Sequence, residues 1–223
     1  MLKLLPRIKR ATKILILQAG FGTSARYIAE THNCKVYCLN DNKVQNKFNQ
    51  EQIDAAELSK LVYVEYGDVD YMPYDPETFD FVIAQDSFSI TAKKRQMFRA
   101  IHRVMKPEAR LIFSAIMRGE KVTDAAEAKI AELPVEELIT ATDYDTDARR
   151  GFFQQIYHTD LSENLGIHFE KLGQALESNK DELVAASSKR FVTERIKACA
   201  TFQELAVSGD VKWGIMMFQK LNS

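Results

Sequence analysis

Two glycines stand where a protein backbone could approach a bound ligand. In the segment LILQAGFGTSARY, residues 15–27, an apolar run ends, Gly20 and Gly22 follow, and a helical pattern begins at Ser24. A glycine has no β carbon, so the main chain around it can lie close to a polar group of a ligand. This arrangement is typical of the loop that opens a nucleotide-binding α/β unit, although a purely structural turn has the same pattern.

Polar residues also follow three later apolar segments. Asn40 comes after the second segment, Asp68 after the third, and the pair Gln85-Asp86 after the fourth. Residues that follow parallel strands meet at one edge of the sheet, where such proteins bind ligands. The Asp68 carboxylate could accept a hydrogen bond from an adenine amino group and Val69 could line the ring, unless Asp68 is a solvated loop acid.

The elements that would position these residues alternate between strand and helix. Short apolar runs predict buried strands at Ile14–Leu17, Lys35–Leu39, Val62–Glu65, Phe79–Ile83 and Arg110–Ser114. Helices are predicted at Ser24–His32, Lys43–Lys60 and Lys93–Val104. The alternation predicts an α/β fold with a doubly wound, mostly parallel sheet that helices cover on both faces.

The second half of the chain is mostly helical in pattern. The pattern of residues 125–205 predicts a mostly helical insertion on the substrate side. A sixth strand or its remnant at Gln154–Thr159 interrupts it. A last strand, Val211–Gln219, completes the sheet within residues 206–223. We therefore expect a single domain, 1–223, whose cofactor-binding core is residues 1–124.

Composition narrows the possible partners. The chain has 223 residues, 46% apolar and 27% charged, as soluble globular proteins do, and its net charge of -1 gives no general attraction to nucleic acid or anionic membranes. Its three cysteines lack metal-ligand partners at short spacing, which predicts no metal site and favours the reducing cytoplasm. No stretch approaches the ~18 apolar residues of a membrane-spanning helix.

Six stretches of the sequence resemble one enzyme family. They are AGFGTSARYIA (19–29), LNDNKVQNKFN (39–49), GDVDYMPYDPETFDFVIAQDSF (67–88), HRVMKPEARLIFS (102–114), DLSENLGIHF (160–169) and KWGIMMFQK (212–220). In them the chain resembles class I S-adenosylmethionine-dependent methyltransferases, most of all the sarcosine/dimethylglycine N-methyltransferases. The resemblance implies a Rossmann-like fold with a seven-stranded sheet, S-adenosylmethionine as cofactor, and a small-molecule amine such as sarcosine or dimethylglycine as methyl acceptor.

Carried over position by position, the resemblance assigns cofactor contacts but no catalytic residue. The cofactor positions are Ala19, Gly20 and Gly22 at the methionyl part, Asn40 with Gln45 at the ribose, Asp68 and Val69 at the adenine, and Gln85 near the sulfonium. The resemblance also places Asp86 on the acceptor side. An amino-acid or methylammonium acceptor further needs an anion-binding group or aromatic faces, for which Tyr157, His168, Arg149 and Arg150 are candidates.

The chain also departs from the family pattern. Ile16 replaces the usual acid of the first strand, Gln18 replaces the first glycine of the loop, and Ile90 stands where a histidine is common. Three interpretations therefore stay open. The protein is an active methyltransferase, a catalytically impaired relative with a binding or regulatory role, or one module of a longer tandem enzyme. A homodimer is compatible with each.

Overall fold

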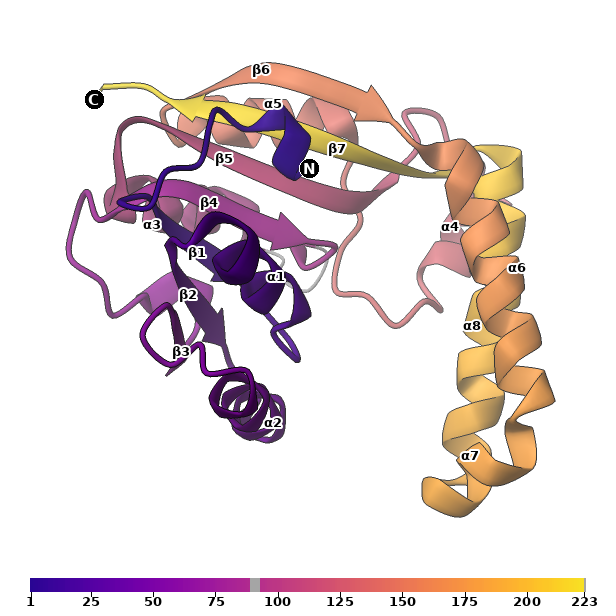
Figure 1. The fold of residues 1–223 in the computed structure, drawn as a ribbon. Helices are drawn as coiled ribbons and strands as arrows, with labels where there is room; N and C mark the ends of the chain where they lie inside the picture. Colours follow the sequence, from indigo (N-terminus) through magenta and orange to yellow (C-terminus); the bar gives the residue numbers. More distant parts are fainter. Residues whose placement is uncertain (89–92, 223) are drawn as a thin grey trace. The chain divides into compact units, whose positions relative to one another are not determined.

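The computed structural model describes residues 1–88 and 93–222, so Ile90 lies outside the described residues. Its centre is a seven-stranded sheet in the order β3-β2-β1-β4-β5-β7-β6 (Figure 1). The strands are β1 (Lys13–Leu17), β2 (Lys35–Asn40), β3 (Val62–Tyr66), β4 (Phe79–Gln85), β5 (Met105–Arg118), β6 (Phe153–Asp160) and β7 (Val211–Lys220). The helices are α1 (Thr23–His32), α2 (Lys43–Ala55), α3 (Lys94–Val104), α4 (Asp124–Ile130), α5 (Ala141–Arg150), α6 (Ser162–Ser178), α7 (Lys180–Ala186) and α8 (Lys189–Ser208). Two short 3-10 helices, η1 (Leu2–Leu4) and η2 (Val69–Tyr71), complete them.

The first five strands run parallel, as the alternating sequence predicts. β1 pairs with β2 on one side and β4 on the other, β2 pairs with β3, and β4 pairs with β5. Strand β7 runs opposite to β5 (Figure 1), so the sheet is mixed at this edge. The predicted doubly wound, Rossmann-like fold is confirmed, and the carboxyl ends of β1 to β4 lie along one edge of the sheet.

Two predicted elements, the fifth strand and the second helix, differ from the observed ones by several residues. The fifth strand begins at Met105 rather than Arg110, because residues 106–109 form a bulge in which Glu108 has a φ of 59°. Helix α2 ends at Ala55 rather than Lys60, since Glu57 adopts a φ of 56° and the Leu58 amide donates back to the Ile53 carbonyl at 3.0 Å. In both places a left-handed residue that is not glycine gave no sequence signal.

The chain divides into two compact units. The sheet unit comprises residues 1–88, 93–115, 143–158 and 215–222, and the helical unit comprises residues 116–142 and 159–214. Most of α5 and β6, which lie inside the predicted insertion, therefore pack with the sheet. In the helical unit, α6 and α8 pack along each other, and the rings of Phe169 and Phe202 stack at 4.3 Å.

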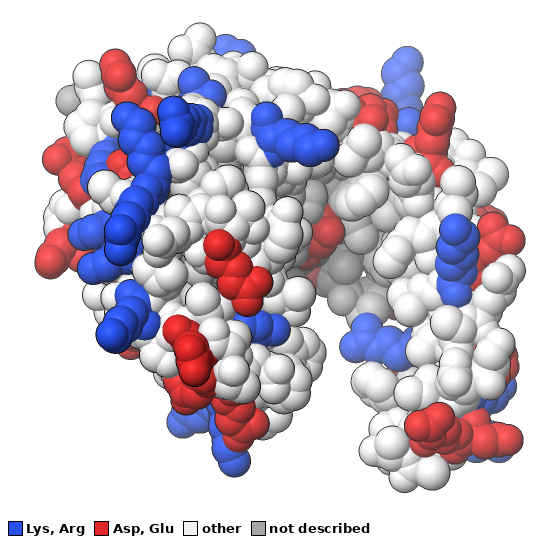
Figure 2. Space-filling view, viewed as in Figure 1, with Lys and Arg blue, Asp and Glu red and all other residues white. Residues whose placement is uncertain are grey.

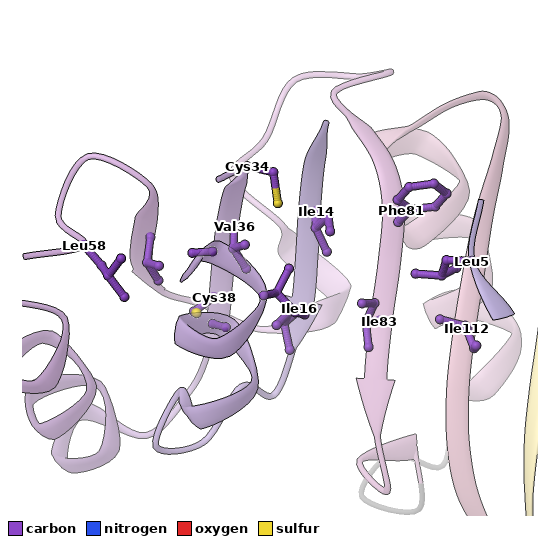
Figure 3. Packing of buried hydrophobic residues seen from close by; sticks show 14 of the residues in the cluster. Leu5, Ile14, Ile16, Cys34, Val36, Cys38, Leu58, Phe81, Ile83 and Ile112 are labelled. Atoms are coloured by element: carbon purple, nitrogen blue, oxygen red, sulfur yellow. The ribbon is translucent and has the colours of Figure 1, made fainter. Parts of the chain in front are cut away.

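One face of the sheet carries the main apolar cluster of the sheet unit. Figure 3 shows residues of β1, β2, β4 and β5 meeting side chains from the surrounding segments, among them Ile14, Ile16, Cys38, Phe81 and Ile83. Ile16 is only 3% exposed. The position where the family usually has an acid is thus part of the core, and its apolar residue stabilises β1 instead of reaching a ligand.

Candidate functional site

The loop between β1 and α1 adopts a conformation that suits glycine. Gln18, Gly20 and Gly22 have φ angles of 50°, 55° and 73°, in the left-handed region. The Gly22 amide donates to the Ala19 carbonyl at 2.9 Å, which closes the turn. Gln18 is the exception in this series, because a residue with a β carbon is strained at such an angle.

The two glycines have different surroundings. A β carbon at Gly22 would overlap the side chain of Asn49, whereas a β carbon at Gly20 would meet no atom within 4 Å. Gly22 is therefore required by the packing of the protein itself. Gly20 leaves open space beside the backbone, which is the arrangement a ligand needs if it is to approach the main chain.

A cavity of about 120 Å³ lies at the carboxyl ends of the strands. It is lined by Leu17, Gln18, Asp41, Asp68, Val69, Asp70, Ser87, Phe88 and Met97, and we call it the strand-end pocket. The structure thus places the predicted residues Asp68 and Val69 in one pocket with Gln18, the residue that follows β1. A crevice of this kind is where doubly wound sheets bind their ligands.

The polar groups of the strand-end pocket differ in their hydrogen bonds and in their burial. The Asp68 carboxylate accepts a hydrogen bond from the Asp70 amide at 2.9 Å, and this turn begins η2. Burial, and then the charge of Asp68, raise the pKa of Asp70, while Lys93 opposes the rise. Ser87 is 8% exposed, and its hydroxyl has no hydrogen-bond partner among the described residues. A buried hydroxyl of this kind can bond to a bound ligand.

The amide expected at the ribose lies inside the protein. Asn40 is 3% exposed, and its Nδ2 donates to Gln45 at 3.0 Å and to Asn46 at 3.1 Å. The structure therefore joins Asn40 and Gln45 to each other rather than to the pocket. The neighbouring Asp41 lines the pocket instead. Sequence reasoning missed Asp41 and Ser87, although both follow predicted strands, because only side-chain direction separates them from their neighbours.

The end of β4 is tied to the start of α1. The Ser24 hydroxyl donates to Gln85 Oε1 at 2.5 Å, and both residues line a second cavity of about 330 Å³. Its other lining residues are Met1, Leu2, Thr23, Tyr27, Ile28 and Ile83. Asp86 has a φ of 50°, and its amide donates to the backbone oxygen and hydroxyl of Ser114 at 3.0 and 3.2 Å. Gln85 and Asp86 are thus held beside the strand-end pocket without lining it.

The two remaining acceptor candidates lie elsewhere. Tyr157 on β6 packs against the apolar cluster of the sheet unit. His168 is on α6 in the helical unit, where it is exposed and its ring lies 5.1 Å from that of Phe169. Neither residue lines the strand-end pocket.

In the part of the chain that the structure describes, no group of three or more His, Cys, Asp or Glu residues is arranged to hold a metal ion. No helix among these residues is long and apolar enough to cross a membrane. Burial raises the pKa of the Cys38 thiol to about 11 and disfavours its reactive thiolate form. On the face drawn in Figure 2, basic and acidic side chains lie among larger uncharged areas, in keeping with the net charge of -1.

Comparison with known proteins relates this geometry to one group of enzymes. Residues 15–113 match the methyltransferase domain family. The chain is 30% identical over 210 residues to the glycine/sarcosine/dimethylglycine N-methyltransferase of Actinopolyspora halophila, covering 94% of this chain but 37% of that protein. It is 26% identical to the sarcosine/dimethylglycine N-methyltransferase of Aphanothece halophytica, covering 94% of this chain and 76% of that one.

Solved structures agree in fold. A candidate sarcosine dimethylglycine methyltransferase from Galdieria sulphuraria superposes with a TM-score of 0.88 at 24% identity, over 96% of this chain and 80% of that one. The phosphoethanolamine N-methyltransferase 2 of Haemonchus contortus, solved with phosphomonomethylethanolamine and S-adenosylhomocysteine, superposes with a TM-score of 0.84 at 16% identity. That match covers 99% of this chain and 51% of the other.

Proposed function

We propose that this chain, which has the sequence and fold of a class I S-adenosylmethionine-dependent methyltransferase, transfers a methyl group to a small-molecule amine such as sarcosine or dimethylglycine. The observation that carries the proposal is the strand-end pocket, where Asp41, Asp68 and Ser87 lie beside a glycine loop with open space at Gly20. The named relatives support the choice of an amine acceptor.

The residues of the pocket are suited to hold the adenosyl part of the cofactor. The Asp68 carboxylate can accept a hydrogen bond from the adenine amino group, and Val69 can pack against the ring. Asp41 can accept hydrogen bonds from ribose hydroxyls, and the unpartnered Ser87 hydroxyl can donate to a nearby acceptor atom. The open space at Gly20 admits the amino-acid end of the cofactor next to the backbone.

When bound, the cofactor supplies an electrophilic methyl group on a sulfonium that loses its positive charge during transfer. The chain's contribution is to bind and orient, and orientation alone can account for a large part of the rate. Three carboxylates, Asp41, Asp68 and Asp70, line one small pocket and favour a cationic ligand there. The bond from Ser24 to Gln85 fixes the end of β4 beside this pocket.

A second function, binding without efficient catalysis, is favoured by one observation. Gln18 lines the strand-end pocket, whose volume of about 120 Å³ is smaller than the ~300–1,000 Å³ of ordinary ligand sites. The Gln18 side chain occupies space that a glycine would leave free. A protein with this loop would bind the cofactor weakly and could serve a regulatory role.

Calorimetry on the full chain distinguishes the two functions. The enzyme proposal expects binding of S-adenosylmethionine and of its demethylated product, followed by transfer of an isotopically labelled methyl group to sarcosine or dimethylglycine. Binding without transfer to any amine in a panel favours the impaired relative, and absence of binding refutes both.

Size-exclusion chromatography with light scattering tests the homodimer, and imaging of the tagged protein in its host cell tests the cytoplasmic location that we also propose.

A further inference from the structure

The loop between β1 and α1 is anchored by a side chain of the helix that follows it. Arg26 is the fourth residue of α1, and its side chain reaches back toward the loop, since the Cα–Cβ bonds of a helix tilt toward its amino end. Its Nη1 donates to the Phe21 carbonyl oxygen at 2.8 Å. Because the Gly22 amide donates to the Ala19 carbonyl at 2.9 Å, the peptide unit between Phe21 and Gly22 is hydrogen-bonded on both sides.

The same nitrogen joins the loop to α2. Nη1 of Arg26 also donates to Oδ1 of Asn49 at 2.9 Å, and Asn49 is 0% exposed. Both acceptors are neutral carbonyl oxygens, so the charge of Arg26 strengthens two hydrogen bonds there. Without Arg26, the buried Asn49 oxygen would lose its donor, which is costly. A half-buried arginine therefore holds the loop on a fixed point of α2.

A ring contact forms a second attachment between the loop and α2. The rings of Phe21 and Phe48 meet edge to face, with centroids 5.4 Å apart. The two residues are 53% and 44% exposed, so this contact lies at the surface rather than in the core. Together, Arg26, Asn49 and Phe48 hold the main chain and the side chain of Phe21, and we call these three residues the loop clamp.

The loop clamp acts on the part of the chain that faces the proposed cofactor site. Gly20, beside which the space is open, directly precedes the clamped Phe21, and Gln18 at the start of the same loop lines the strand-end pocket. Asp41 of that pocket lies two residues before the start of α2. Helix α2 is thus connected to the pocket at its first turn and to the glycine loop through Asn49.

We propose that Arg26 is a positioning residue for the cofactor, because it holds the peptide between Phe21 and Gly22 on Asn49 and so keeps the space at Gly20 open to the amino-acid end of S-adenosylmethionine. This inference rests on the proposed function. If the unclamped loop adopts other conformations, the measured Kd rises in inverse proportion to the fraction of molecules that keep the open one. Cofactor binding selects the open loop, so the rate of transfer from the bound state should not change.

The test removes the two hydrogen bonds of the guanidinium group. Arg26→Met keeps an unbranched side chain without donors, and Arg26→Lys keeps a charged donor for the same oxygens. The matched control is Arg190→Met, since Arg190 is an exposed arginine whose partner, Glu194, lies on the same helix. Urea denaturation of the full chain establishes that each variant is folded under the conditions of the assays.

The first measurement is hydrogen exchange by NMR without any cofactor. In Arg26→Met the Gly22 amide should exchange roughly tenfold faster, because local opening of the loop becomes easier, while the Ile16 amide of β1 should not respond. Arg26→Lys and the control should exchange as the wild type does. No change at Gly22, or an equal change at Ile16, would overturn the inference.

The second measurement is calorimetry with three ligands: S-adenosylmethionine, its demethylated product, and adenosine, which lacks the amino-acid end. For the first two, Arg26→Met should raise the Kd roughly tenfold, and Arg26→Lys should restore most of the affinity. The Kd for adenosine should stay within about a factor of two of the wild-type value, because adenosine does not extend to Gly20. In steady-state assays the KM for S-adenosylmethionine should rise while kcat stays the same.

Two binding results would contradict the positioning role. An unchanged Kd for S-adenosylmethionine in Arg26→Met would mean that the cofactor does not depend on the loop clamp, and an equal loss for adenosine would mean general damage to the pocket. Failure of the proposed function gives a different pattern. If the wild type binds none of the three ligands while Gly22 still exchanges faster in Arg26→Met, the proposed function is wrong and Arg26 only stabilises a loop.

Discussion

Gly22 lies against the side chain of Asn49, so closely that a β carbon at position 22 would fall 1.8 Å from Asn49 Oδ1. Asn49 is fully buried on α2, and its Oδ1 accepts a hydrogen bond from Arg26 of α1 at 2.9 Å. Gly22 has a φ of 73° directly before α1. The contact therefore joins the start of α1 to α2 through a position that only glycine can occupy without strain.

Gly22→Ala should reduce the free energy of unfolding by at least ~2 kcal/mol, since a left-handed residue with a β carbon costs about 1–2 kcal/mol and overpacking adds about 1–3. Urea denaturation followed by circular dichroism measures this. The control is Gly20→Ala, where φ is 55° but the space is open. It should cost only the backbone strain, about 1–2 kcal/mol, and lose cofactor affinity. Equal stabilities of the two variants would contradict the assigned role of Asn49.

Gln18→Gly should both stabilise the protein and tighten S-adenosylmethionine binding. The φ of 50° at Gln18 suits glycine, so relief of strain should raise stability by about 1 kcal/mol. Loss of the side chain enlarges the strand-end pocket and should strengthen binding. A binding free energy more favourable by about 1.4 kcal/mol corresponds to a tenfold lower Kd. Gln18→Ala separates the effects, since it shortens the side chain but keeps the strain. Weaker binding by the glycine variant in calorimetry would mean that Gln18 contacts the ligand.

Asp68→Ala should weaken cofactor binding by roughly 10- to 100-fold, because a hydrogen bond to a charged acceptor contributes about 1.5–3 kcal/mol. The same change removes the acceptor of the Asp70 amide. Asp68→Asn keeps an oxygen for that turn and removes the charge, so it isolates the electrostatic part. Calorimetry gives both dissociation constants. A Kd unchanged in both variants would make Asp68 a solvated loop acid.

The stability of the protein should depend on the protonation of Asp70. Burial and the charge of Asp68 raise the pKa of Asp70 in the folded state above its ordinary value. The folded state then binds the proton more tightly than the unfolded state, and stability falls as pH rises from the ordinary pKa through the raised one. Asp70→Asn should therefore stabilise the protein at pH 7 relative to the wild type, and this advantage should shrink below the ordinary pKa. Thermal midpoints across this range check it, and a difference independent of pH would refute the assigned cause.

The strands and the polar or glycine residues that follow them could be predicted from the sequence, because their signals are local. The runs at β1 and β4 are apolar at nearly every position, as strands buried on both faces must be. Together with the alternation of strands and helices, these runs predicted the parallel sheet. Gly20 and Asp68 were identified because each lies in the loop that follows a strand, β1 for Gly20 and β3 for Asp68. Their positions at the carboxyl edge come from chain order, which the sequence contains.

Only the tertiary structure decided which neighbour at each strand end lines a site. Asn40 and Asp41 are adjacent in sequence, yet Asn40 bonds to Gln45 and Asn46 within the protein while Asp41 lines the strand-end pocket. Successive side chains near a strand end point in different directions, so a shift of one residue exchanges a buried group for a ligand-facing one. Sequence patterns locate the end of a strand only to within a residue or two.

The tertiary structure also decides which residues far apart in the sequence contact each other. The contact of Gly22 with Asn49 and the bond from Ser24 to Gln85 depend on how α1 packs against its neighbours. The pairing of Arg149 with Asp145 and of Arg150 with Asp147 likewise depends on side-chain distances that the sequence does not contain. The sequence by itself determined the order of the elements and the class of chemistry at their ends. The tertiary structure decided which charges are already paired and which remain available to a ligand, because pairing depends on distances in space that no local pattern encodes.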